Sequence, residues 1–150
     1  MANKRIAILV DSGADVPQEY VEKHPIYIAP LKIIYKDREY NDRLDITPQE
    51  VYARLEEEIP RTSLPDSGIV KGLLEQIKQD GFDTVLVITI SSGLSGTHNL
   101  LRLLSEECEG LTFHFVDTLN IGIGAGLQAV LAAQLIAQGE EIPRILEKLE

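Results

Sequence analysis

The sequence predicts an α/β fold in which a mostly parallel sheet carries helices on both faces. Residues 84–90 form a short, apolar and β-branched run, which is typical of a strand buried on both faces. Residues 5–11 and 111–117 are further strand-like runs, and each ends in an aspartate. Helix-like segments separate these runs, and strands that alternate with helices build parallel sheets.

The first half of the chain shows more interrupted patterns. Pro17 is placed to open a short helix that runs through Lys23. Residues 24–35 are rich in strand-forming side chains, but Pro30 cannot donate to a strand ladder, so we expect an edge or bent strand. Residues 37–42 are polar and turn-like, which predicts the tip of a small hairpin or flap.

Capping signals define the helices that follow. Residues 47–58 begin with a Thr-Pro-Gln-Glu capping box, and residues 60–68 form a second polar loop with two prolines. Asp66 or Ser67 can cap the next helix, which ends at Gly81. Three later helices are expected over residues 100–110, 121–137 and 141–150.

A serine- and glycine-rich loop follows the central strand. Residues 91–97 contain four hydroxyls and two glycines. In open α/β sheets, such loops lie at the carboxyl ends of strands, where ligands bind. One hydroxyl is enough to cap a helix, so four are more than capping requires. The first amides of the next helix and the helix dipole favour a bound anion. The loop therefore predicts a site for an anion or a carboxylate.

Composition and charge restrict the class of protein. The 150 residues suffice for one domain, predicted over residues 1–150, and they are 44% hydrophobic and 25% charged. A net charge of -10 argues against nucleic acid or an anionic membrane as the main partner. Cys108 is the single cysteine, so no intrachain disulfide can form. With neither a signal peptide nor a membrane-spanning run, a cytoplasmic protein without membrane insertion is expected.

Other kinds of site have weaker support. Asp11 and Asp117 each close a strand and could share one sheet edge, which suits a metal ion, but acids also cap turns after strands. We therefore expect no metal. The run from Gly93 through Ser95 to Thr97 partly matches G-x-S-x-G, with threonine at the last glycine, so a serine hydrolase remains an alternative.

A dinucleotide cofactor is not expected either. Gly122 and Gly124 match the first two places of G-x-G-x-x-G, but Leu127 stands at the third. Small residues here more plausibly let a helix pack closely against the sheet or line a narrow apolar tunnel.

Five short segments share the motifs, order and spacing of one protein family. They are residues 10–17 (VDSGADVP), similar to D-S-T-A-D-L-P; residues 28–31 (IAPL), similar to V-P-L; residues 61–67 (RTSLPDS), similar to T-S-Q-P-S; residues 90–97 (ISSGLSGT), similar to I-S-S-x-L-S-G-T; and residues 116–118 (VDT), similar to V-D-S. The chain thereby resembles the DegV family of bacterial fatty-acid-binding proteins.

The resemblance implies that a long-chain fatty acid lies in a buried tunnel between two α/β lobes, without a cofactor. Some family members present the carboxylate to a separate fatty acid kinase, which makes an acyl phosphate for phospholipid synthesis. The protein itself is then a carrier and not an enzyme. Carried over by motif, Thr62 and Ser95 are the carboxylate ligands, with Ser63, Ser92 and Gly96 as neighbours.

The chain departs from the family pattern at three positions. Gly13 replaces a threonine, Thr118 a serine and His98 the usual tyrosine, and both expected carboxylate ligands are kept. The match covers only the amino-terminal lobe, and the last predicted helix lacks a C-cap. We therefore expect a chain cut inside a longer protein, with the second lobe absent. An open apolar groove is expected along the helix that starts near Gly122, where that lobe would dock.

Three classes of function follow from these patterns. The main hypothesis is a fatty-acid carrier. The second is an enzyme, either a serine hydrolase or a phosphotransfer domain, since dihydroxyacetone kinases have a fold related to that of the DegV family. The third is a structural module of a larger regulator.

Overall fold

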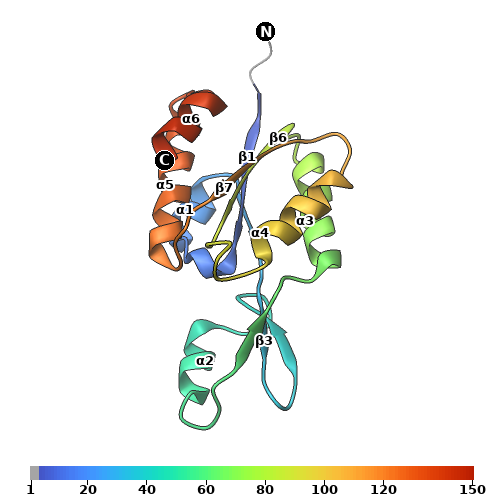
Figure 1. The fold of residues 1–150 in the computed structure, drawn as a ribbon, viewed down its shortest axis with the longest axis vertical. Helices are drawn as coiled ribbons and strands as arrows, with labels where there is room; N and C mark the ends of the chain where they lie inside the picture. Colours follow the sequence, from blue (N-terminus) through green and yellow to red (C-terminus); the bar gives the residue numbers. More distant parts are fainter. Residues whose placement is uncertain (1–3) are drawn as a thin grey trace.

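A computed structural model describes residues 4–150 as an α/β body with a small lobe that projects from one end (Figure 1). Residues 1–3, which the sequence places ahead of the first strand, lie outside the described part. The sheet of the body is parallel throughout, with the order β2-β1-β6-β7. Its strands are β1 (Ile6–Asp11), β2 (Ile26–Ala29), β6 (Thr84–Thr89) and β7 (Thr112–Asp117).

Helices cover both faces of this sheet, as the sequence predicted (Figure 1). One face carries α1 (Gln18–Lys23), α5 (Ile123–Ala137) and α6 (Ile142–Leu149). The other face carries α3 (Ser67–Gln79) and α4 (Thr97–Glu106). A short 3-10 turn, η1 (Ser12–Ala14), follows β1. No helix within residues 4–150 is long and apolar enough to cross a bilayer.

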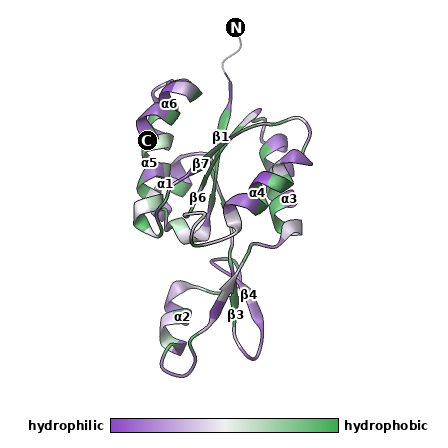
Figure 2. Ribbon diagram, viewed as in Figure 1, coloured by the Kyte–Doolittle hydropathy of each residue, from purple (hydrophilic) through white to green (hydrophobic). Residues whose placement is uncertain are grey.

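The central strands β1 and β6 are buried on both faces. In β1, Ile6, Ile8 and Val10 pack against α5 and α6. Ala7 and Leu9 point to the other face and pack against α3 and α4. Because successive side chains of a strand point to opposite faces, a strand between two helical layers must be apolar at every position. Figure 2 shows this apolar character on the central strands.

The small lobe has its own antiparallel sheet with the order β4-β3-β5. It consists of β3 (Lys32–Ile34), β4 (Glu39–Asn41), α2 (Pro48–Arg54) and β5 (Arg61–Ser63). The predicted capping box is present, because the Thr47 hydroxyl accepts from the Glu50 amide and the Glu50 carboxylate accepts from the Thr47 amide. A minor core of Ile33, Tyr35 and Ile46 holds the lobe together.

Several predicted elements differ from the observed ones. The helix predicted over residues 47–58 ends at Arg54, and residues 39–41, within the predicted tip over residues 37–42, form strand β4. The strand expected over residues 24–35 is divided at Pro30 into β2, at the edge of the parallel sheet, and β3, at the centre of the small sheet. The first part of the loop expected over residues 60–68 is strand β5, in which Thr62 pairs with Ile33. All three residues of β5 are exposed, so the sequence carries no alternation of apolar and polar side chains there.

One face of α5 is apolar and exposed. Ile123, Leu127 and Leu131 recur every four residues and are 52%, 58% and 37% exposed. This surface is a stripe of side chains along the helix where the sequence predicted an apolar groove. That a second lobe covers it stays a prediction.

The close packing of α5 on η1 gives a test of the fold. A methyl group at Gly126 would lie 2.3 Å from the carbonyl oxygen of Ala14, a backbone atom that cannot move aside alone. We expect Gly126→Ala to lower the free energy of unfolding by about 1–3 kcal/mol, measured by urea denaturation. Gly72→Ala is the matched control, because no atom lies within 4 Å of that position in α3. It should stabilise by about 0.5–1 kcal/mol. Equal effects of the two substitutions would contradict this packing.

The apolar stripe predicts self-association of the 150-residue chain. Exposed apolar surface of this extent favours contact between copies, so light scattering should give a mass above that of the monomer. Replacing both Leu127 and Leu131 by glutamate should restore the monomer, whereas Gln134→Glu, at an exposed position of the same helix, should not. A wild-type chain that is monomeric at high concentration would contradict the prediction.

Candidate functional site

The Ser–Gly loop, predicted over residues 91–97 and observed over residues 90–96, lies at the carboxyl edge of the parallel sheet between β6 and α4. On one side it is tied to the end of β1. The carboxylate of Asp11 accepts hydrogen bonds from the amides of Ile90, at 2.8 Å, and Gly13, at 2.9 Å. Burial raises the pKa of the Asp11 carboxyl above its usual value, although these two hydrogen bonds oppose the rise.

On the other side the loop is tied to the end of β7. The Asp117 carboxylate accepts from the amide of Ser92, at 3.1 Å, from the Ser92 hydroxyl and from the amide of Leu119, at 3.2 Å. Burial alone would raise the pKa of Asp117, but the hydrogen bonds to its charged form prevail, and the pKa lies below the usual value. The Ser92 hydroxyl is therefore already engaged.

The two aspartates hold the loop in place. Asp11 and Asp117 lie at the same sheet edge, as the sequence suggested, at the ends of the two strands that flank β6. Each carboxylate already accepts a hydrogen bond from a backbone amide of the loop. Over residues 4–150, no group of three or more His, Cys, Asp or Glu side chains could hold a metal ion. The turn-capping interpretation accounts for both residues.

Ser95 lies at the start of α4 and is half-buried. Its Oγ accepts a hydrogen bond from the Thr97 amide, at 3.1 Å, and lies 2.8 Å from the Thr97 hydroxyl, which is fully buried. This role of Thr97 was not predicted from the sequence. A hydroxyl two residues after Ser95, at the beginning of a helix, was the available signal.

Thr62 lies on the small lobe, in β5, and is exposed. Leu64 follows two residues later. Its two methyl carbons would lie 3.5 and 3.8 Å from a Cβ atom added at Gly96. The segment that carries Thr62 therefore meets the loop that carries Ser95. Ser63, which pairs with Lys32, is exposed on the same strand.

The geometry gives no support to a serine nucleophile. A hydrolase serine needs a histidine base within hydrogen-bond reach. The Nδ1 atom of His98 instead lies 2.8 Å from the Thr89 hydroxyl, and its ring packs edge-on against Phe115. The hydrogen bonds found in the described chain join His98 to neither Ser92 nor Ser95.

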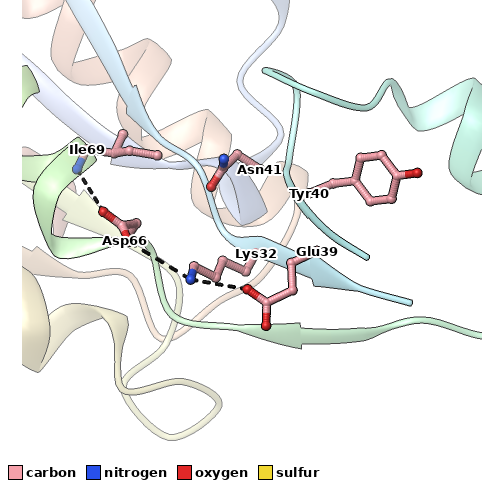
Figure 3. Close-up of a pocket in the computed structure, with 6 residues that line it drawn as sticks. All are labelled: Lys32, Glu39, Tyr40, Asn41, Asp66 and Ile69. Atoms are coloured by element: carbon pink, nitrogen blue, oxygen red, sulfur yellow. Dashed lines mark hydrogen bonds and ion pairs between the residues drawn. The ribbon is translucent and has the colours of Figure 1, made fainter. Parts of the chain in front are cut away.

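A separate cavity of about 170 Å³ lies where the small lobe meets α3 (Figure 3). Its cation, Lys32, lies 3.4 Å from Glu39 and 3.9 Å from Asp66, which also caps α3 through the amide of Ile69. Two carboxylates around one ammonium leave the cavity without net positive charge, so it is not suited to an anion.

Comparison with known proteins decides the family. The model of the family described as "Uncharacterised protein, DegV family" matches residues 5–150. The chain belongs to the DegV family. It is 42% identical to a DegV domain-containing protein of Clostridium acetobutylicum and 36% identical to a protein of Thermotoga maritima named fatty acid-binding protein; each match covers 97% of this chain and 52% of the relative.

Solved DegV structures have the same fold. The crystal structure of DegV from Bacillus subtilis, described as a fatty acid binding protein, superimposes with a TM-score of 0.90 at 28% identity, over 97% of this chain and 52% of that one. The chain thus spans about half the length of the relatives that it matches.

The hydrogen bonds at Asp117 give a test of how the loop is held. Because the folded-state pKa of Asp117 is lowered, these bonds stabilise the protein above pH 3.8, and the stabilisation is lost as the pH falls through the folded-state pKa. We expect Ser92→Ala to raise the pKa of Asp117, measured by carboxyl NMR, and to destabilise the protein at neutral pH more than in acid. Ser95→Ala, in the same loop, should leave this pKa unchanged. An unaltered pKa in Ser92→Ala would show that the Ser92–Asp117 contact is absent in solution.

Proposed function

We propose that this chain provides the carboxylate end of a long-chain fatty-acid site, in which the hydroxyls of Thr62 and Ser95 bind one carboxylate. The approach of Leu64 to Gly96, where an added Cβ would lie 3.5 Å from a Leu64 methyl carbon, is the observation that carries the proposal, because the two segments that hold these hydroxyls are close there. The Thermotoga and Bacillus relatives are named fatty-acid-binding proteins, which supports the same ligand class.

The surroundings of Ser95 suit it as a hydrogen-bond donor. A hydroxyl has one proton and two acceptor lone pairs. When Thr97 donates both its amide and its hydroxyl proton to Ser95, the Ser95 proton remains for a ligand. Accepting two hydrogen bonds polarises an O–H group and strengthens its own donation. Neutral donors at the start of α4 can thus bind a carboxylate without a lysine or arginine.

Exposed apolar side chains near the loop support an acyl chain as the rest of the ligand. Leu94 lies in the Ser–Gly loop, and Leu119 and Ile121 lie in the segment that follows β7. The two segments are in contact, since the amide of Ser91 donates to the carbonyl of Asn120 at 2.8 Å. Burying an acyl chain yields about 0.8 kcal/mol per CH₂, so apolar contacts supply most of the affinity.

We further propose that the protein presents the bound carboxylate to a separate fatty acid kinase in the cytoplasm, for acyl-phosphate formation and phospholipid synthesis. Thr62 is exposed and Ser95 half-buried, so a carboxylate between them is accessible from outside. This arrangement fits a carrier that takes no chemical part in the phosphoryl transfer.

Substitution of the two hydroxyls tests the site. Ser95→Ala or Thr62→Val removes a hydrogen bond to a charged group, worth about 1.5–3 kcal/mol. We expect the Kd of the full-length protein for palmitate to rise by roughly tenfold to a hundredfold, measured by calorimetry. Thr112→Val is the matched control, because Thr112 is also an exposed strand threonine but lies at the opposite end of β7. It should bind palmitate like the wild type.

Ester hydrolysis measured on the same variants separates the carrier from the alternative enzyme. A carrier hydrolyses no ester in any variant and binds fatty acid more weakly in Ser95→Ala. If the wild type hydrolyses esters, and Ser95→Ala abolishes the hydrolysis while fatty-acid binding is unchanged, the protein is a serine hydrolase and the carrier proposal is wrong.

A further inference from the structure

The two proposed carboxylate ligands belong to different sheets. Thr62 lies on the antiparallel sheet of the small lobe, and Ser95 follows β6 of the parallel sheet. The distance between their hydroxyls therefore depends on how the lobe is set on the body. A misplacement of about 1 Å is enough to weaken a shared hydrogen-bonding site.

Side chains of η1 and its neighbour hold the base of the small lobe. The Ser12 hydroxyl accepts from the amide of Leu31, at 3.0 Å, where the chain passes from β2 to β3. The carbonyl of Leu31 in turn accepts from the amide of Asp42, at 2.9 Å. Next to these bonds, Arg43 of the lobe forms an ion pair of 2.7 Å with Asp15 of the body.

The backbone at both ends of this ion pair is unusual. Asp15 has a φ of 48° and Arg43 a φ of 65°, so both lie in the left-handed region. That region costs a residue with a side chain roughly 1–2 kcal/mol, and an arginine side chain, unlike that of asparagine or aspartate, makes no short-range hydrogen bond to its own backbone that favours it. Strained residues persist where the surrounding structure requires them, often at functional sites.

A second ion pair provides an internal comparison. Arg54 and Asp37 form a contact of 3.0 Å within the small lobe, with side chains 30% and 56% exposed. Arg43 and Asp15 are 29% and 58% exposed, so the two pairs are nearly identical in solvent screening. They differ in what they join. Of these two pairs, that of Arg43 and Asp15 links the lobe to the body, as the longer contact of Lys32 with Asp66, at 3.9 Å, also does.

We propose that the Asp15–Arg43 ion pair positions the small lobe so that the Thr62 hydroxyl reaches the carboxylate bound by Ser95. This inference rests on the proposed function. Neither Asp15 nor Arg43 needs to touch the ligand, and both are positioning residues. The ion pair then affects recognition of the carboxylate and has no effect on burial of the acyl chain.

The test compares affinities of the full-length protein for palmitate and for its methyl ester, which has the same chain without the charge. We expect Asp15→Asn, which tolerates the left-handed backbone, to lower the acid-to-ester affinity ratio about two- to fivefold, as for loss of a partly exposed ion pair. Arg43→Gln should do the same, and Arg43→Lys should restore part of the ratio. Asp37→Asn, the matched control, should leave the ratio unchanged.

The outcomes separate this inference from the proposed function. If Thr62→Val lowers the acid-to-ester ratio but Asp15→Asn does not, the carboxylate site holds and the positioning role is wrong. The same conclusion applies if Asp15→Asn weakens acid and ester equally, or if Asp37→Asn acts as strongly as Asp15→Asn. If neither Thr62→Val nor Ser95→Ala changes the ratio, the carboxylate site is wrong and the positioning role is wrong with it.

Discussion

The Ser–Gly loop is held between two carboxylates, and the candidate site depends on this constraint. Asp11 binds the loop from β1 through the amide of Ile90, and Asp117 binds it from β7 through Ser92. The loop is thus fixed on both sides of the strand that it follows. Serine and glycine alone would form a mobile segment, because short polar side chains and glycine leave many conformations accessible. Fixing the loop places Ser95 at a defined position at the start of α4.

The parallel sheet holds only half of the proposed site. Thr62 comes from a lobe with its own minor core, which joins the body through the segment before β3 and the segment after β5. A carboxylate shared between the two sheets would link their relative orientation to ligand binding. At the base of the lobe, Ser12 contacts Leu31 and Asp15 contacts Arg43, and we propose that these polar contacts maintain the orientation before any ligand arrives.

The sequence predicts two kinds of element well. One is a segment in which every residue has the same environment, and the other is a motif whose hydrogen bonds require particular residue types. The strand over residues 84–90 could be recognised because a strand between two helical layers is apolar at each position, and the capping box at Thr47 because its two hydrogen bonds require particular residue types. Strand β5 could not be recognised, because three exposed residues show no periodic pattern. The division of residues 24–35 between two sheets was indicated only by Pro30.

Site residues differ in the same way. Thr62 and Ser95 were proposed from family motifs, whereas the approach of Leu64 to Gly96 involves residues more than thirty positions apart and has no local signal. The part played by Asp11 and Asp117 was ambiguous, because an aspartate at a strand end suits a metal ion as well as a turn. Only the positions of the neighbouring amides favour the turn. No pattern in the sequence distinguishes Arg43, whose proposed role follows only from its backbone conformation and its partner.

A crystal structure of the full-length protein with bound palmitate would show whether Thr62 and Ser95 share one fatty-acid carboxylate. We expect both hydroxyl oxygens to lie within hydrogen-bond distance, about 2.5–3.0 Å, of the carboxylate oxygens, with the acyl chain leading away from the Ser–Gly loop. A carboxylate that lies away from the loop, or that contacts only one of the two hydroxyls, would contradict this expectation.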